Sequence, residues 1–335
     1  MRIFIPFFLL ALTLTSCHKV QDDTTYNEEL AEITLGIAVP ELQTRADGDM
    51  SSYNSAFGAI DYFDDAEWAK YDLRYSLVIY SADGTTRINQ TPIVKCVDRY
   101  ETITYDLVLV KDKTYKFVIF ADFVNQGTTT DLYYNTEDFK AITMKDGMMG
   151  AMDEARDAYY ISENITVNES GNKSMMLTRP FGKLRLVATD YPEYNFSAPI
   201  SAEITYYNKP VYKSFNAVNG EVATERVDGE LTSTFDLSQN RYSAGLDSDK
   251  HNMTLCVDYL LANRNGDDTP VNFTFKIFFK DNVVQEHDFK TEIPIKRNHL
   301  TTILGNILTE DVDTETWIND QFDGEIGEEF IEKEE

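Results

Sequence analysis

Residues 271–280 have the sequence Val-Asn-Phe-Thr-Phe-Lys-Ile-Phe-Phe-Lys, and this stretch decides the fold class of the chain. Large apolar residues occupy every second position from Val271 to Phe279, and most of the residues between them are polar. Side chains in an extended strand alternate between its two faces, so a period of two predicts a strand with one buried face.

The same alternation recurs along most of the chain, and the segments at 200–207, 231–237 and 253–261 follow one another at spacing compatible with hairpins. Residues 136–157 lack it and are expected to be irregular or partly helical. The 20 Tyr and 20 Phe residues also favour strands over helices. This many strands without a long helix predict an all-β protein. We expect strands at 33–39, 73–81, 101–110, 113–123, 158–167, 174–178, 183–189, 200–207, 231–237, 253–261, 271–280, 283–289 and 300–308.

The number of strands favours two tandem β-sandwich domains over one large barrel. A chain of 335 residues has room for two domains at about 150 residues each. The pattern begins again near Arg179-Pro180, which places the boundary between an N-terminal domain at 46–178 and a C-terminal domain at 179–309.

The N-terminus has the features of a secretory signal. A positive Met1-Arg2 precedes an apolar run that is too short to span a bilayer, and the sequence Leu-Thr-Ser-Cys follows at 14–17. This ending is similar to a bacterial lipobox, which implies removal of residues 1–16 and lipidation of Cys17. A diacylglycerol with an added acyl chain, such as palmitate, anchors a protein durably. The alternative is an ordinary signal peptide with an incidental cysteine.

The segment that follows contains an isolated strand and then an exposed loop. Ile33, Leu35, Ile37 and Val39 alternate with smaller or polar residues, and a proline ends the run. The loop after it is small, polar and charged, and it contains Arg45 followed by Ala46. Such loops are natural sites of proteolysis.

Charge and cysteine content exclude several classes of function. Removal of residues 1–16 leaves 29 basic and 57 acidic residues, and a chain this acidic repels the phosphates of nucleic acid. No hydrolase, metalloprotease or phosphate-loop motif occurs, and the histidines lack partners at metal-ligand spacing. We therefore expect no catalytic residue, metal or cofactor. Cys96 and Cys256 are expected to be unpaired thiols.

The C-terminal segment, residues 310–335, has two interpretations. It holds 12 acidic residues and one lysine, which is typical of a solvated terminus. It also holds aromatic and apolar residues, including Trp317 and Ile318, which solvating tails lack. Under the second interpretation it contains a strand that docks on a sheet.

Together these features resemble the fimbrillin family of type V pili, in the lipobox, the early strand, the arginine loop and the two β-domains. Arg-Pro-Phe-Gly-Lys-Leu at 179–184 is similar to that family's entry to its second domain. Lys-Arg-Asn-His-Leu-Thr at 296–301 and Gly-Asn-Ile-Leu-Thr at 305–309 are similar to its closing strand. The similarity covers nearly the whole chain after the signal, and the sandwiches it implies are of a transthyretin-like or Greek-key type.

The resemblance implies a mechanism and a set of partners. A surface protease would cut between Arg45 and Ala46 and release the lipidated segment 17–45. The loss of Ile33 to Val39 would open a groove that a strand of another fimbrial subunit fills by β-strand addition. The chain would thus be a structural subunit of a pilus at the outer membrane, in a polymer of like or unlike subunits. The tail, 310–335, is the candidate donor strand.

The alternative is a lipid-retained protein, either a pilus anchor or a surface lipoprotein that binds a glycan or host ligand. Such a protein would keep the strand at 33–39 and would display an aromatic cleft. Core packing is the competing role for most of the aromatic residues that could line it. These residues are Tyr53, Phe57, Tyr62, Phe63, Trp68 and Tyr71.

Overall fold

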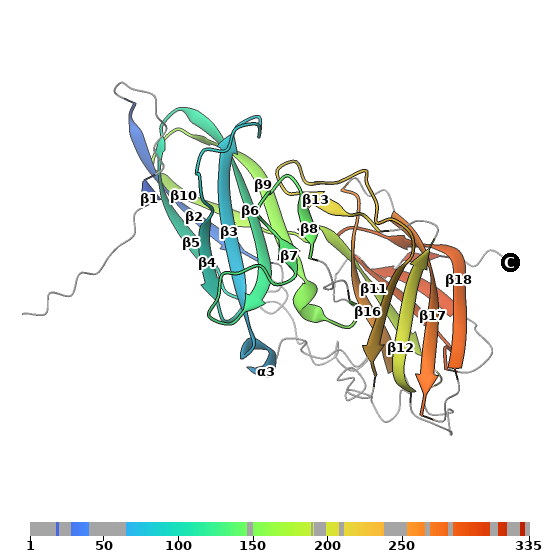
Figure 1. Cartoon of the computed structure of the whole chain (residues 1–335). Helices are drawn as coiled ribbons and strands as arrows, with labels where there is room; N and C mark the ends of the chain where they lie inside the picture. The colour runs from blue at the N-terminus through green and yellow to red at the C-terminus, as the bar shows by residue number, and fades with distance from the viewer. Residues whose placement is uncertain are drawn as a thin grey trace, which may run out of the picture.

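The computed structural model of the chain describes residues 18–19, 28–39, 65–145, 150–188, 190, 199–207, 211–237, 253–264, 269–280, 284–308, 314–319 and 329–331. Apart from the short helix α3 (Asp65–Trp68) and the 3-10 turn η1 (Glu154–Arg156), the regular structure in these residues is β. The all-β prediction is therefore confirmed. Figure 1 shows the N-terminal strands, blue to green, at one end of the molecule and the C-terminal strands, yellow to red, at the other.

The N-terminal half contains two four-stranded sheets, in the orders β4-β3-β6-β9 and β1-β5-β2-β10. Their buried side chains form one hydrophobic core. The hydroxyl of Tyr105 in the second sheet donates to the carbonyl of Tyr75 in the first at 3.0 Å. The strands are β1 (His18–Lys19), β2 (Leu30–Ala38), β3 (Tyr71–Ser81), β4 (Ile93–Val97), β5 (Ile103–Val110), β6 (Lys113–Asn125), β9 (Ala158–Val167) and β10 (Gly171–Met176).

The C-terminal half contains a five-stranded sheet, β16-β11-β19-β20-β21, and a four-stranded sheet, β15-β12-β17-β18. The alternation predicted for 271–280 is confirmed, because Phe273, Phe275 and Ile277 of β17 are fully buried in a second core. The strands are β11 (Phe181–Ala188), β12 (Pro199–Tyr207), β15 (Leu231–Asp236), β16 (Met253–Leu261), β17 (Thr269–Phe279), β18 (Val284–Ile295), β19 (Leu300–Gly305), β20 (Thr314–Asn319) and β21 (Glu329–Ile331).

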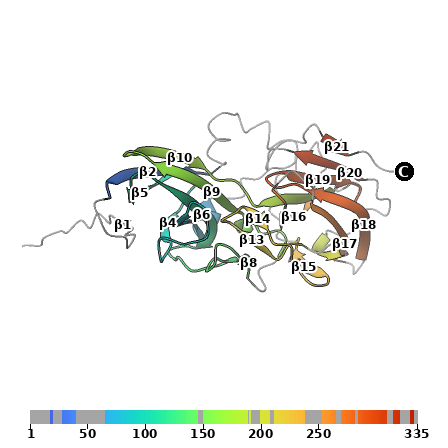
Figure 2. The same ribbon diagram turned by 90° about the horizontal axis from the view of Figure 1, so that it is seen from above.

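The tail adds a strand to this half. β20 pairs antiparallel with β19, from Leu300 opposite Asn319 to Gly305 opposite Thr314. Of the two interpretations of residues 310–335, the docked strand is therefore the one that the structure supports. Figure 2 shows β20 and β21 beside β19.

A fifth, smaller sheet joins the two halves, in the order β14-β13-β8-β7. Ser214 and Phe215 of β13 pair with Thr143 and Ile142 of β8. Figure 2 shows β13 and β14 in the middle of the molecule, between the two larger groups of strands. Its strands are β7 (Tyr134–Asn135), β8 (Ile142–Met144), β13 (Ser214–Asn216) and β14 (Glu221–Val222).

Buried ion pairs reinforce the same junction. Arg156 of η1 pairs with Asp258 of β16 at 2.5 Å, and Lys183 of β11 pairs with Glu154 of η1 at 3.2 Å, with all four side chains 5% exposed or less. Removing one partner of such a pair leaves a buried charge uncompensated, at a cost of about 3–5 kcal/mol. The two halves are thus joined by backbone hydrogen bonds and by charge.

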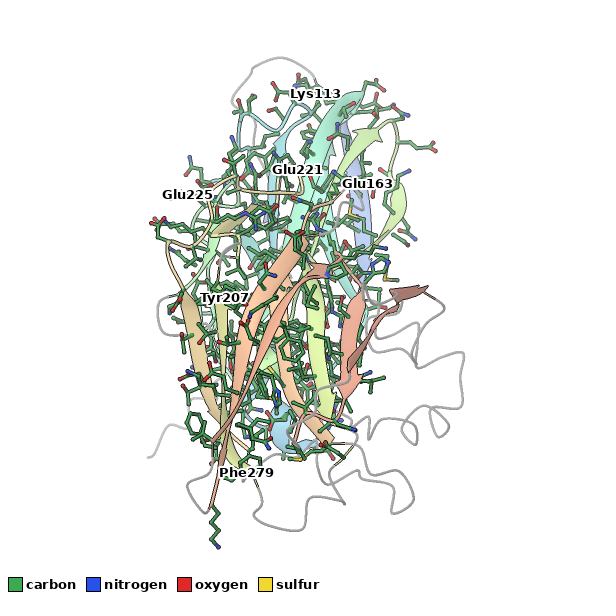
Figure 3. All side chains as sticks on the ribbon, turned by 90° about the vertical axis from the view of Figure 1, so that its right-hand side faces the viewer. Lys113, Glu163, Tyr207, Glu221, Glu225 and Phe279 are labelled. Carbon is green, nitrogen blue, oxygen red and sulfur yellow. The ribbon has the colours of Figure 1, made fainter. Side chains whose placement is uncertain are left out.

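Several further observations bear on the sequence predictions. Cys96 and Cys256 are both free thiols, as expected. No helix in the described residues is long and apolar enough to cross a membrane. Figure 3 shows Lys113, at the start of β6, and Phe279, at the end of β17, at opposite extremities of the molecule.

Candidate functional site

The strand β2 lies in the interior of its sheet rather than at an edge. It pairs antiparallel with β5, from Leu30 opposite Val110 to Ile37 opposite Ile103. On its other side it pairs parallel with β10 over residues 33–38. Figure 1 shows β2 among these strands at the N-terminal end of the molecule. The backbone of β2 therefore forms hydrogen-bonded ladders with a neighbouring strand on each of its two sides.

One face of β2 belongs to the hydrophobic core. The side chains at every second position from Ala31 to Val39 are at most 2% exposed, and Leu35, Ile37 and Val39 are fully buried. Complete burial of each large aliphatic side chain contributes about 1.5–3 kcal/mol. The alternation of Ile33, Leu35, Ile37 and Val39 predicts one buried face of a strand, and the structure confirms that face, with the first three residues in β2 and Val39 directly after it.

The neighbours of β2 present apolar side chains to the same face. Directly opposite Ile33, Leu35 and Ala31, the β5 residues Leu107, Tyr105 and Leu109 are each at most 2% exposed. Met175 of β10, opposite Ile37, is also buried. Without β2, these residues would line an apolar groove with unpaired backbone groups along both walls.

The polar contacts of β2 are few, and they lie on its outer face. Thr34 donates to Asp106 at 2.8 Å, and the backbone N–H of Glu32 donates to Ser170 at 2.9 Å. Both contacts are exposed to solvent. The strand is therefore held mainly by its backbone ladder and its apolar face.

The strand β5 depends on the same N-terminal segment on both of its sides. His18 and Lys19 of β1 pair parallel with Leu107 and Val108, on the side of β5 away from β2. Both strands that flank β5 in this sheet thus lie within 17–45. Release of that segment would leave β5 without a partner in its own sheet.

Other predicted site residues lie outside the described part of the chain. Cys17, Arg45 and Ala46 are among them, so lipidation at Cys17 and cleavage between Arg45 and Ala46 stay predictions. The same holds for four of the six aromatic residues of the proposed cleft. These four are Tyr53, Phe57, Tyr62 and Phe63.

The two remaining aromatic residues do not form an open cleft. Trp68 is 6% exposed and packs edge-on against Tyr100, with ring centroids 5.0 Å apart, and against Phe123. Tyr71, at the start of β3, is half-buried and packs against the same core. Of the two roles predicted for these aromatic residues, Trp68 therefore has core packing.

A buried charge cluster lies in the other sheet of the N-terminal half. Arg74 of β3 donates to both carboxylate oxygens of Asp122 of β6, at 2.9 and 2.8 Å, and contacts Asp131 at 2.8 Å. Burial raises the pKa of Asp122 to about 6, although the charge of Arg74 opposes this shift. Asp122 is therefore ionised at neutral pH and titrates in mildly acidic solution.

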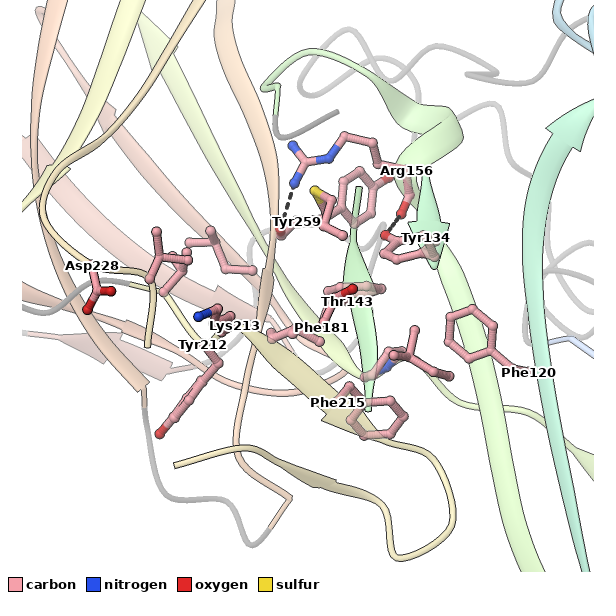
Figure 4. Close-up of a pocket in the computed structure, with 17 residues that line it drawn as sticks. Phe120, Tyr134, Thr143, Arg156, Phe181, Tyr212, Lys213, Phe215, Asp228 and Tyr259 are labelled. Atoms are coloured by element: carbon pink, nitrogen blue, oxygen red, sulfur yellow. Dashed lines mark hydrogen bonds between the residues drawn. The ribbon is translucent and has the colours of Figure 1, made fainter. Parts of the chain in front are cut away.

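A cavity of about 380 Å³ lies at the junction of the two halves (Figure 4). No local sequence pattern predicts this cavity, because its lining comes from many separate segments. Thr143, Arg156, Lys213 and Asp228 supply polar groups. Most of its wall is aromatic or aliphatic and includes Phe120, Tyr134, Phe181, Tyr212, Phe215 and Tyr259.

Comparison with known proteins gives one family match and several similar folds. A family model described as a family of unknown function (DUF6562) matches residues 23–334. No curated protein matches the chain. Among solved structures, the tip fimbrial protein Mfa3 from Porphyromonas gingivalis is 10% identical, with a TM-score of 0.48 over 87% of this chain and 100% of that one.

Two further solved structures are similar to the chain at the same level. A putative cell adhesion protein from Bacteroides ovatus is 11% identical, with a TM-score of 0.46 over 88% of this chain and 99% of that one. A fimbrial assembly protein from Parabacteroides distasonis is 13% identical, with a TM-score of 0.42 over 90% and 99%.

Proposed function

The chain belongs to DUF6562, a family of unknown function, and we propose that it is a structural subunit of a cell-surface fimbria that exchanges β2 for a strand of another subunit. The observation that carries the proposal is the position of β2. It is bonded on both sides, contributes four alternate side chains to the core with Val39 directly after it as the fifth, and lies just before the arginine loop in sequence. The role proposed here is assembly and adhesion, not catalysis.

The exchange would begin with a cut between Arg45 and Ala46. Before the cut, β2 is part of the same chain, and its effective concentration at the groove is in the millimolar range or above. No external strand competes with it under those conditions. After the cut, the segment 17–45 can dissociate, and a strand from a neighbour can enter.

The opened groove would be costly to leave empty. The strands β5 and β10 would expose unpaired backbone groups, and buried residues such as Tyr105 and Leu107 would meet water. An incoming strand restores both the ladder and the core, which is the energetic basis of β-strand addition. The need for an incoming β-strand supports a partner that belongs to the same class of fimbrial subunits.

The location follows from the N-terminal segment. Lipid on Cys17 would hold the uncut protein at the outer membrane, exposed at the cell surface, and the cut would release it into the fimbrium. The order of a charged start, a short apolar run and Ser16-Cys17 supports this part of the proposal.

The test uses a lipid-free chain that begins at His18 and limited trypsin treatment, with the cut located by mass spectrometry. After cleavage at Arg45, a labelled peptide of residues 28–40 should enter the groove, as followed by fluorescence anisotropy. An Arg45→Ala chain should not take up the peptide, whereas Arg99→Ala, an exposed arginine elsewhere, should behave like the parent. A cleaved chain that keeps its own segment and binds no peptide would contradict strand exchange.

The cavity at the junction favours a second candidate function, a lipid-retained lipoprotein that binds a glycan or host ligand. A concave, largely apolar site with a few polar groups is typical of small-ligand binding. A Val227→Trp variant would fill the cavity, and Val94→Trp on an exposed strand serves as its control. Binding on a glycan array that Val227→Trp abolishes and Val94→Trp retains would support this function.

A further inference from the structure

The groove that β2 occupies makes a specific demand on any strand that replaces it. The five inward positions, Ala31 to Val39 at every second residue, are each at most 2% exposed. A replacement strand must therefore supply five apolar side chains in strict alternation. The outward position at Gly36 is permissive, since an added methyl group would have no neighbour closer than 3.6 Å.

The tail of the chain, 310–335, does not meet this demand. No nine-residue window in it has more than three apolar residues at its five alternate positions. The two best windows are 318–326 and 322–330, and they would place Asp320 and Glu328, respectively, at a buried position. Reversing the direction of the strand does not help, because the same residues still share a face.

A carboxylate at one of these positions would strongly disfavour insertion of the strand. Each position is sealed from water in the structure, and moving an ionised carboxylate into such a site without a partner costs several kcal/mol or forces it to take up a proton. Both windows also place Gly324 at an inward position, which fills no pocket. The tail thus loses contacts at two of the five positions.

The described part of the tail is also engaged elsewhere. Thr314 to Asn319 of β20 pair with β19 in the chain's own C-terminal sheet. The window 318–326 overlaps this strand, so its use as a donor would break part of that ladder. Self-complementation would therefore lose existing hydrogen bonds as well as bury a charge.

We propose that the partner of the β2 groove is an extended segment of a different protein, with apolar residues at five alternate positions, and not a second copy of this chain. This inference rests on the proposed strand exchange and narrows its partner. It assigns the chain to a junction between unlike subunits rather than to a homopolymeric stalk.

The entrance of the groove adds a second requirement. Lys111, in the turn before β6, and Lys113, the first residue of β6, pair with Glu29 and Glu28 just before β2, at 3.0 and 2.8 Å respectively. Lys113 lies at an extremity of the molecule (Figure 3). Exposed pairs of this kind contribute little to affinity but favour encounter with a partner of matching charge. We expect the partner segment to carry acidic residues at the end that meets these lysines.

The experiment compares four peptides on the chain that begins at His18, after cleavage at Arg45. The first peptide covers residues 28–40 and the second is its Leu35→Asp variant. The other two cover 316–328 and 320–332 of the tail and contain its two best windows. Affinity is measured by fluorescence anisotropy, and self-assembly of the cleaved chain by light scattering during size-exclusion chromatography.

The 28–40 peptide should bind at least about 100-fold more tightly than either tail peptide, since each 1.4 kcal/mol is a factor of ten. The Leu35→Asp peptide should fall to the level of the tail peptides. The inference is overturned if a tail peptide binds within about tenfold of 28–40, or if the cleaved chain forms a ladder of oligomers alone. If none of the four peptides binds the cleaved chain, the proposed strand exchange itself is contradicted, and this inference is contradicted with it.

Discussion

Leu35 of β2 lies directly opposite Tyr105 of β5, and both side chains are buried. The hydroxyl of Tyr105 donates to the carbonyl of Tyr75 in the facing sheet, so this pair connects β2 to both layers of the N-terminal half. The position of Leu35 is therefore the point at which a change in β2 should have the largest effect on stability.

We expect Leu35→Ala to lower the free energy of unfolding by about 2–5 kcal/mol, because the site cannot collapse around the lost methyl groups. Thr34→Ala, on the outer face of the same strand, removes one exposed hydrogen bond and should cost about 1 kcal/mol or less. Urea denaturation of the uncut chain measures both. Equal effects of the two substitutions would mean that β2 is not anchored by its inner face.

The free energy of unfolding of the chain should depend on pH through the titration of Asp122. Its pKa is raised to about 6 in the folded state, above the ordinary value of 3.8, because burial disfavours the charged form. The folded state therefore holds a proton that the unfolded state has lost, and this contribution to stability is present below pH 4 and is lost as the pH rises toward 6.

The free energy of unfolding of the parent minus that of Asp122→Asn should therefore decrease as the pH rises from 4 to 6. Asp83→Asn is the control, because hydrogen bonds from Ser81 and Thr85 lower the pKa of Asp83 to about 2. Its contribution is present above pH 4 and is lost only at lower pH, so its difference curve should be flat from pH 4 to 6. A rising curve for Asp122→Asn would show that the pairing with Arg74 outweighs burial.

The sequence was sufficient to predict the elements in which alternation and burial agree. The strand expected at 101–110 contains β5, and the one at 33–39 overlaps β2, because large apolar side chains occupy their alternate, buried positions. The strand β3 was predicted with one buried face, yet Arg74 and Ser76 on its other face are buried too. A loop covers that face, since Arg74 donates to the carbonyl of Thr129.

The elements that depend on distant partners could not be predicted. The strands β13 and β14 are two or three residues long and have no pattern of their own. They exist because Phe215 packs against Tyr160, with ring centroids 4.6 Å apart, and because its backbone pairs with Ile142. The candidate groove was predictable from the residues of β2, whereas its second wall, β10, required the parallel pairing that only the structure supplies.

Lipidation is expected at Cys17. The residue after it, His18, pairs with Leu107, so an attached lipid would lie close to the N-terminal half of the molecule. Labelling of cells with a palmitate analogue should give a signal in the parent that Cys17→Ser abolishes. Cys96→Ser should keep the signal, because that residue is a half-buried thiol in a β-strand. Label that persists in Cys17→Ser would exclude this residue as the anchor.

The last prediction concerns Gly182, in the Arg-Pro-Phe-Gly-Lys-Leu segment that resembles the fimbrillin motif. A methyl group at Gly182 would lie 2.4 Å from the backbone carbonyl oxygen of Lys296 and 2.5 Å from the Ile295 side chain. The oxygen belongs to the backbone and can move only if β11 separates from the end of β18. We expect Gly182→Ala to destabilise the chain by about 1–3 kcal/mol or more, as overpacking of a core does.

Gly171→Ala is the matched control for Gly182→Ala. An added methyl group at Gly171 meets nothing within 4 Å, and its φ lies outside the left-handed region. This substitution should be neutral or stabilise by up to about 1 kcal/mol through the unfolded state. Thermal unfolding followed by circular dichroism compares the two variants. If Gly182→Ala unfolds at the temperature of Gly171→Ala, then close approach of the backbones is not the reason for glycine in this motif.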